Sequence, residues 1–189
     1  GSGVDGLASM AEQSYLSFGN DGITIFRPLL DFERQTLRNV LKFYEVDWIE
    51  DPTNNDQSFE RVRVRDLLAR VVEIGIDKNT IGRTALLMQS AKTALNHFAS
   101  DCYEKFGSCN NGDIIFDFDE FSKQPLDIKR RLISAAQKWI SNQKYRPRLS
   151  QVDGLINSID EKITFSGSGT ICYFHENSIR ITREVNASV

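Results

Sequence analysis

The sequence predicts a mostly α-helical protein with a small α/β segment near its N-terminal end and a short β-meander at its C-terminal end. Three observations support this fold class. Apolar residues recur at helical spacing in several segments, and short strand-like runs lie between Gly, Ser and Asn turns near the C-terminus. A content of 40% hydrophobic and 26% charged residues is typical of a globular protein. The 189 residues suffice for one ordinary domain or two small ones.

The first predicted elements are a strand and a helix. Residues 23–27 alternate enough between apolar and polar side chains to favour a strand, and Pro28 ends it. Between Phe32 and Tyr44 the apolar side chains fall on one helical face and basic side chains lie opposite. Residues 46–49 are expected to form a short strand or an extended turn.

A turn and two helices follow. Asp51 to Asp56 contains the residue types that favour turns, and Ser58 is a suitable N-cap for a helix over residues 61–74. Gly75 interrupts this helix. From Asp77 to Phe106 apolar residues then recur over about seven turns, which predicts the longest helix of the chain.

The rest of the chain is predicted to hold two more helices and several short strands. Pro125 is expected to open a helix whose buried stripe includes Ile128, Leu132 and Ala136, and residues 149–159 are expected to form the other helix. Strands are expected at residues 114–118, 163–165, 170–174 and 179–182, with a turn at 110–112.

Cysteine and histidine usage argues against two kinds of site. Cys102, Cys109 and Cys172 form no Cys-x-x-Cys pair, and His97 and His175 lie far apart in the sequence. A disulfide framework or a zinc site is therefore not expected, and reduced cysteines favour a cytoplasmic protein. No stretch reaches the roughly 18 apolar residues of a membrane span, and the first residues lack the pattern of a signal peptide.

The charge of the chain is unevenly distributed. The net charge is −3, yet residues 123–148 contain eight lysine and arginine side chains and only one carboxylate, that of Asp127. A basic segment in an acidic chain suggests a local surface for a polyanion. The alternatives are a solvated helix face, or ion pairs with carboxylates elsewhere in the chain. Helical spacing predicts that Lys129, Arg130 and Arg131 point largely away from the apolar stripe.

Residues 48–65 combine carboxylates with arginines. A carboxylate-rich turn runs into a helix start that carries Arg61, Arg63 and Arg65, of which Arg61 and Arg65 share a face. Taken alone, the turn is equally well an Asx-rich turn with a helix cap. In order, the segment reads Trp48-x-Glu50-Asp51-Pro52-Thr53-Asn54-x-Asp56-x-x-Phe59-x-Arg61-x-Arg63-x-Arg65, and Arg27-Pro28-Leu29-Leu30 precedes it.

This order and spacing resemble the latter part of the catalytic domain of the tRNA(Ile)-lysidine synthetases. The glycine-rich opening resembles the family's segment before the first strand, and the downstream helices, Tyr145 to Arg148 and the closing Arg183-Glu184 resemble the domain that follows. The resemblance implies the end of a Rossmann-like catalytic domain over residues 1–75. It also implies a helical, substrate-binding domain with a terminal meander over residues 76–189, which helps to hold tRNA.

The resemblance further implies an ATP-dependent tRNA-modifying ligase of bacteria. Members of the family use ATP to adenylate C2 of the wobble cytidine of tRNA(Ile), and the side-chain amine of lysine then displaces AMP to form lysidine. Carboxylates near a triphosphate suit Mg²⁺, and fixed arginines offset the charge that develops on the leaving group. The motif places Asp51, Asn54, Asp56, Arg61 and Arg65 at or beside the active site, with Arg27 as a further candidate.

The predicted tRNA contacts combine one arginine of this motif with the basic segment. A cationic helix and the loop after it suit the phosphates of a nucleic acid. The predicted residues are Arg63, Lys129, Arg130, Arg131, Lys138, Lys144, Arg146 and Arg148.

Two departures from the family pattern qualify the resemblance. Val62 stands where the family usually has asparagine, and the family's Ser-Gly-Gly-x-Asp-Ser loop is not found. Gly1 to Gly6 has misplaced glycines and no preceding strand to aim backbone N–H groups at a phosphate. We therefore expect a fragment that is inactive by itself, with no cofactor or metal bound. The alternatives are a non-catalytic RNA-binding adaptor and another ATP-dependent tRNA-modifying enzyme such as a thiolase, although the cysteine spacing argues against a thiolase.

Overall fold

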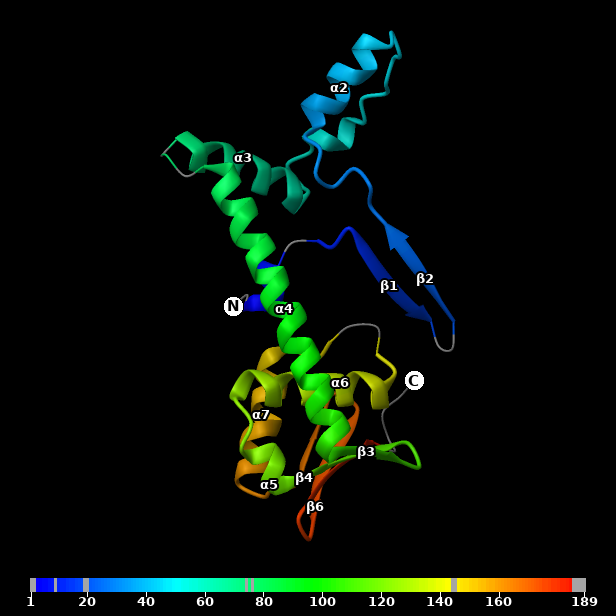
Figure 1. The fold of residues 1–189 in the computed structure, drawn as a ribbon, viewed down its shortest axis with the longest axis vertical. Helices are drawn as coiled ribbons and strands as arrows, with labels where there is room; N and C mark the ends of the chain where they lie inside the picture. Colours follow the sequence, from blue (N-terminus) through cyan, green and yellow to red (C-terminus); the bar gives the residue numbers. More distant parts are fainter. Residues whose placement is uncertain are drawn as a thin grey trace. The chain divides into compact units, whose positions relative to one another are not determined.

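A computed structural model of the chain describes residues 3–8, 10–18, 21–73, 75, 77–143 and 146–184. The chain forms two compact units, residues 1–92 and residues 93–189 (Figure 1). The division falls inside the long helix α4, Lys78–Phe106. This helix confirms the prediction of the longest helix in the chain. The predicted boundary after residue 75 falls between α3 and α4, where Gly75 has a φ of 92° that favours glycine.

The N-terminal unit consists of a β-hairpin and short helices. Its strand β2 confirms the predicted strand. The partner strand β1 was not predicted, because half of the side chains from Gln13 to Phe18 are polar and the strand pairs with β2 alone among the described strands. Residues 46–49 form no strand. The elements are α1 (Val4–Leu7), β1 (Gln13–Phe18), β2 (Asp21–Phe26), α2 (Arg34–Phe43), the 3-10 helix η1 (Pro52–Asn55) and α3 (Glu60–Glu73).

Apolar side chains of the N-terminal unit are largely exposed. Among its described residues only Val62 is buried, whereas Phe26, Phe43 and Ile49 are exposed to 60%, 80% and 95%. The described residues of these elements therefore bury little apolar surface against one another. Elements with few buried apolar contacts have low local stability, so polar contacts carry more of the local structure here.

The C-terminal unit is built on one antiparallel sheet of five strands in the order β3-β4-β7-β6-β5. The predicted meander is thus part of a larger sheet, which the strands after α4 extend. Asn111 and Gly112, with φ values of 51° and 87°, form the predicted turn between β3 and β4, as two-residue hairpin loops require. The strands are β3 (Gly107–Asn110), β4 (Asp113–Asp117), β5 (Phe165–Gly167), β6 (Thr170–His175) and β7 (Ser178–Arg183).

Three helices and the end of α4 complete this unit. They are α5 (Phe118–Ser122), α6 (Leu126–Ser141) and α7 (Leu149–Asp160), and α6 contacts β4, β6, β7 and α7 (Figure 1). Pro125 is the N-cap of α6, and Asn142 ends it in the left-handed conformation. The core includes Phe116, Ile133, Leu155 and Ile181, all at 1% exposure or less. Within the described residues, no helix is long and apolar enough to cross a bilayer.

The polar side chains of Gln137 and Thr170 are buried beside this core. Gln137 of α6 is fully buried, and its Nε2 donates to Thr170 Oγ1 at 3.2 Å and to the Gly167 carbonyl at 3.4 Å. Thr170 Oγ1 in turn donates to the same carbonyl at 2.9 Å. These hydrogen bonds tie α6 to the β5–β6 turn and satisfy the amide nitrogen, which would be costly to bury without partners. Gln137 Oε1 accepts no hydrogen bond from the described residues.

Phe116 provides a test of the C-terminal core. Its ring lies 5.7 Å from that of Phe121 and 6.2 Å from that of Tyr103. We expect Phe116→Ala to lower the free energy of unfolding by about 3–5 kcal/mol, because it removes buried apolar surface and leaves a cavity. Urea denaturation followed by far-ultraviolet circular dichroism measures this.

The matched control is Leu126→Ala in the same unit, because Leu126 is half exposed. It is expected to change stability by less than about 0.5 kcal/mol. Equal decreases in stability from the two substitutions would contradict the assignment of the core.

Candidate functional site

The carboxylate of Glu50 connects the polar segment 48–56 to helix α2. It accepts hydrogen bonds from Trp48 Nε1 at 2.7 Å, from Arg34 Nη2 at 3.1 Å and from Arg38. Arg34 and Arg38 lie four residues apart on α2 and therefore share a face. The Arg38 guanidinium also lies 5.7 Å from the centre of the Trp48 ring, a cation–π distance. We call these four residues the Glu50 cluster.

The electrostatics of the Glu50 cluster keep the carboxylate ionised. The Trp48 hydrogen bond lowers the pKa of Glu50, and the charges of Arg38 and Arg34 lower it further. The side chains remain one third to one half exposed, so the cluster fixes geometry more than it adds stability. Sequence reasoning did not single out Glu50. The available signal was the Arg34-x-x-x-Arg38 spacing ahead of an acidic segment.

The two aspartates predicted at the active site cap the turns that hold the segment. Asp51 Oδ1 accepts from the Thr53 N–H at 2.9 Å and so caps η1. Asp56 Oδ1 accepts from the Ser58 N–H at 2.8 Å, and this hydrogen bond lowers the pKa of Asp56. Between them, the Asn54 N–H donates to the Asp51 carbonyl at 3.1 Å. Both carboxylates therefore have a local structural role, and the lowered pKa of Asp56 keeps that carboxylate charged at neutral pH.

Arginines follow on helix α3. Arg61 and Arg65 lie one turn apart on its backbone, but their side chains are outside the described part of the structure. Arg63 Nη1 donates to the carbonyls of Gln57 and Ser58 at 3.1 and 3.2 Å, and so holds the loop before the helix. A surface hollow of about 340 Å³ lies beside this loop, lined by Gln57, Arg63, Asp66, Leu67 and Arg70.

Arg27 holds the start of the hairpin. Its Nη1 donates to the Ala11 carbonyl at 3.1 Å and to Ser14 Oγ at 2.9 Å. Both hydrogen bonds lie within the hairpin region of the N-terminal unit. The geometry therefore gives Arg27 a structural function, whereas its proposed place beside an active site stays a prediction.

The first half of the basic segment is neutralised within the C-terminal unit. Lys129 pairs with Asp160 at 3.4 Å, and Arg130 makes two hydrogen bonds to Asp153 at 2.7 and 2.9 Å. The prediction that Arg131 points away from the apolar stripe is wrong, since Arg131 is 9% exposed. It donates to Asp127 at 2.9 Å and to Asn96 of α4 at 2.7 Å, so this side chain links α6 to α4.

The second half of the basic segment remains at the surface. Lys138, Arg146 and Arg148 are exposed, and Lys144 lies outside the described residues. Among the residues that the structure describes, neither Lys138 nor Arg148 forms an ion pair. Exposed positive charge thus gathers near the C-terminal end of α6 and the start of α7.

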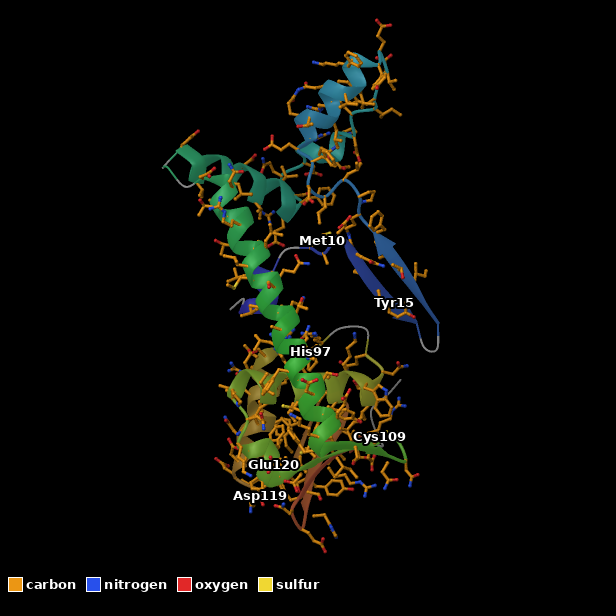
Figure 2. All side chains as sticks on the ribbon, in the orientation of Figure 1. Met10, Tyr15, His97, Cys109, Asp119 and Glu120 are labelled. Carbon is orange, nitrogen blue, oxygen red and sulfur yellow. The ribbon has the colours of Figure 1, made fainter. Side chains whose placement is uncertain are left out.

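The cysteine and histidine side chains lie in different environments. Burial raises the pKa of the Cys172 thiol to about 12, so this thiol stays protonated at neutral pH. His97 pairs with Asp101 on the surface of α4, and Figure 2 shows it well separated from Cys109. In the described ranges, no group of three or more His, Cys, Asp or Glu side chains converges as a metal site.

Comparison with known proteins relates both units to one group of enzymes. A family model described as "PP-loop domain" matches residues 1–72. Proteins named tRNA(Ile)-lysidine synthase from Wolbachia pipientis and Ruegeria pomeroyi are 35% and 30% identical over 97% and 98% of the chain. The protein of that name from Bartonella tribocorum is 55% identical over 86% of the chain. The chain spans 43% of the first two relatives and 33% of the third.

The Glu50 cluster predicts a response to acid. Because the folded-state pKa of Glu50 is lowered below its ordinary value of 4.5, the hydrogen bonds of the carboxylate persist above that pH. They break as the pH falls through the lowered pKa. In a Trp139→Phe variant, Trp48 is the one tryptophan left of two. We expect its fluorescence to change with a midpoint below 4.5.

Glu50→Gln in the same background is the control for this titration. This variant has no titrating carboxylate at position 50, so its Trp48 fluorescence is expected to show no transition with that midpoint. At neutral pH its fluorescence should already resemble that of the protein with Glu50 protonated. Two results would refute the cluster. One is that Glu50→Gln titrates like the protein with Glu50 intact, and the other is a midpoint above 4.5 in the protein with Glu50 intact.

Proposed function

The chain belongs to the family of the tRNA(Ile)-lysidine synthases, and from this premise we propose that it forms part of an enzyme that uses ATP to join lysine to tRNA(Ile). The observation that carries the proposal is similarity over 97% of the chain to an enzyme of that name, which includes both units. In the proposed reaction, C2 of the wobble cytidine is adenylated, and the side-chain amine of lysine then displaces AMP. We assign this reaction to the whole protein, in the cytoplasm of a bacterium.

We place the active-site contribution of this chain at the segment from Asp51 to Asp56 and the start of α3. Three observations support this assignment: the Glu50 cluster holds the segment against α2, the pKa of Asp56 is lowered, and Arg61 and Arg65 lie one turn apart. Charged groups fixed before the reaction stabilise developing charge without reorganisation. The arginines would act on the phosphates of ATP or on the AMP that leaves.

The fit of Mg²⁺ to these residues is incomplete. Asp51 and Asp56 each accept a backbone N–H within their own turn, and among the described residues no group of three or more His, Cys, Asp or Glu side chains could hold a metal ion. Magnesium is usually held by one or two carboxylates together with substrate phosphates and water. We therefore assign no step of the reaction to a magnesium ion held by these residues. The proposal is limited to the interaction of the arginines with the negative charge of ATP or AMP.

In the C-terminal unit we propose a tRNA-binding surface. Its centre is the second half of the basic segment, in which Lys138, Arg146 and Arg148 are exposed. Lys144 belongs to the same segment of the sequence and is included in the proposal. The ion pairs of Lys129 and Arg130 with α7, and the burial of Arg131, support a role for these three in holding α6 in place. Arg63 is the proposed contact in the N-terminal unit.

A salt titration tests the tRNA surface. In the whole protein, Lys138, Arg146 and Arg148 are changed together to glutamine, and the affinity for an unmodified tRNA(Ile) transcript is measured at several salt concentrations. We expect weaker binding and a shallower dependence of log affinity on log salt, by roughly 0.9 for each phosphate that the variant no longer binds.

The matched control changes Lys105, Lys162 and Arg183, three exposed cations of the same unit, to glutamine. It removes the same charge and is expected to change the slope much less. Equal effects from the two triple variants would contradict a localised surface and leave only a general charge effect.

The arginines of α3 test the active-site assignment. In the whole protein, Arg61→Ala and Arg65→Ala are each expected to reduce single-turnover lysidine formation by orders of magnitude while the thermal melt stays unchanged. Arg83→Ala, at an exposed position of α4, is the control. Near-normal activity together with a stability decrease of about 1 kcal/mol would instead make these residues parts of a helix cap.

A further inference from the structure

Trp139 is unusually exposed for its residue type. Its side chain lies near the C-terminal end of α6 at 57% exposure, although tryptophan is on average highly buried in folded proteins. The neighbouring positions Ala136, Gln137 and Ile140 are buried. Trp139 therefore stands at the edge of the buried stripe, where its ring gains little from the core. A large aromatic side chain left in solvent marks a binding surface when its surroundings favour a ligand.

The sequence on both sides of Trp139 is strongly cationic. No aspartate or glutamate occurs between Asp127 and Asp153 in the sequence. Lys138 precedes the tryptophan directly, and Arg146 and Arg148 follow on the segment that leads into α7; all three are exposed. In the described part of the chain, no carboxylate pairs with Lys138 or Arg148.

The charge on α6 is therefore divided along the helix. Its first half carries Lys129, Arg130 and Arg131, which pair with Asp160, Asp153 and Asp127. Its last turns carry Lys138 and Trp139, for which the chain supplies no carboxylate nearby in the sequence. A structural role explains the first set of cations and does not explain Lys138. An aromatic ring with exposed cations around it is the combination that binds single-stranded nucleic acid, because bases stack on the ring and phosphates meet the cations.

We propose that Trp139 is a stacking platform for an unpaired base of RNA, with Lys138 and Arg148 contacting the flanking phosphates. The inference rests on the proposed function, since it specifies how the C-terminal unit binds tRNA. It requires an unpaired nucleotide, because the faces of a base within a duplex are already covered by its neighbours. A loop or a single-stranded end of the RNA satisfies this requirement, whereas the stem of a duplex does not.

Trp139 itself reports on the interaction. In the Trp48→Phe variant it is the one remaining tryptophan of the two in the chain. We expect a short single-stranded oligoribonucleotide to quench its fluorescence, and a blunt duplex of the same sequence to quench it much less. Trp139→Ala is expected to weaken binding of the single strand by about tenfold or more, since stacking on an aromatic side chain contributes substantially for each base. Trp139→Phe should retain most of the affinity.

The salt dependence separates stacking from charge. Trp139→Ala leaves the phosphate-binding cations in place, so the slope of log affinity against log salt should stay as in the wild type. The double variant Lys138→Gln and Arg148→Gln should lower that slope by roughly 0.7 for each phosphate of a single strand that it no longer binds. Leu126→Ala, at the half-exposed opposite end of α6, is the matched control and should leave binding unchanged.

The outcomes distinguish this inference from the function on which it rests. If tRNA binds through the basic residues but Trp139→Ala binds the single strand as the wild type does, the stacking platform is wrong and the tRNA surface stands. Equal quenching by the duplex also overturns it, because a paired base offers no free face. If neither oligoribonucleotide nor tRNA binds, the proposed tRNA surface fails and this inference fails with it; Trp139 then is a contact for a protein surface.

Discussion

The packing of α6 against strands β4, β7 and β6 is the constraint on which the C-terminal unit depends. Ile133, Ala136 and Ile140 lie with Ile179 and Ile181 in one core, and α7 adds Leu155 and Ile159 to the same core. Because α6 presents a buried stripe to the sheet, its remaining faces are restricted to two environments: contact with α4 and α7, or solvent. Every charged residue of the helix takes its role from this division.

That division explains why neighbouring cations of α6 differ in their contacts. Arg130 and Lys129 reach carboxylates of α7, and Arg131 donates to Asn96 of α4, so these side chains hold helices together. Partly buried ion pairs of this kind are geometrically specific. The bidentate contact between Arg130 and Asp153 is more specific than a single hydrogen bond. Beyond Gln137, the helix carries no such pair among its described residues. Lys138 meets solvent, which is the condition for contact with a phosphate backbone.

The N-terminal unit is organised on a different principle. It buries almost no apolar surface among its described residues, and polar contacts hold the segment from Trp48 to Asp56 instead. Glu50 gathers two guanidinium groups and an indole, Asp51 caps η1, and Asp56 caps the turn before α3. Such contacts fix the orientation of a segment but contribute little to the free energy of unfolding, because each side chain remains partly in water. A segment arranged in this way is ordered locally by its own charges.

The sequence by itself determined the local elements and the family resemblance. Helical periodicity located α2, α3, α4, α6 and α7, and Asn111-Gly112 located the hairpin turn, because these signals depend on residues a few positions apart. The order of residues from Trp48 to Arg65 identified the family without any structure. Only the tertiary structure decided that β3 and β4 join the meander in one sheet, that Arg131 is buried, and that Glu50 rather than its neighbours binds α2. Strand pairing, burial and ion pairs depend on which distant segment lies alongside, and that information is not contained in the spacing of residues within one element.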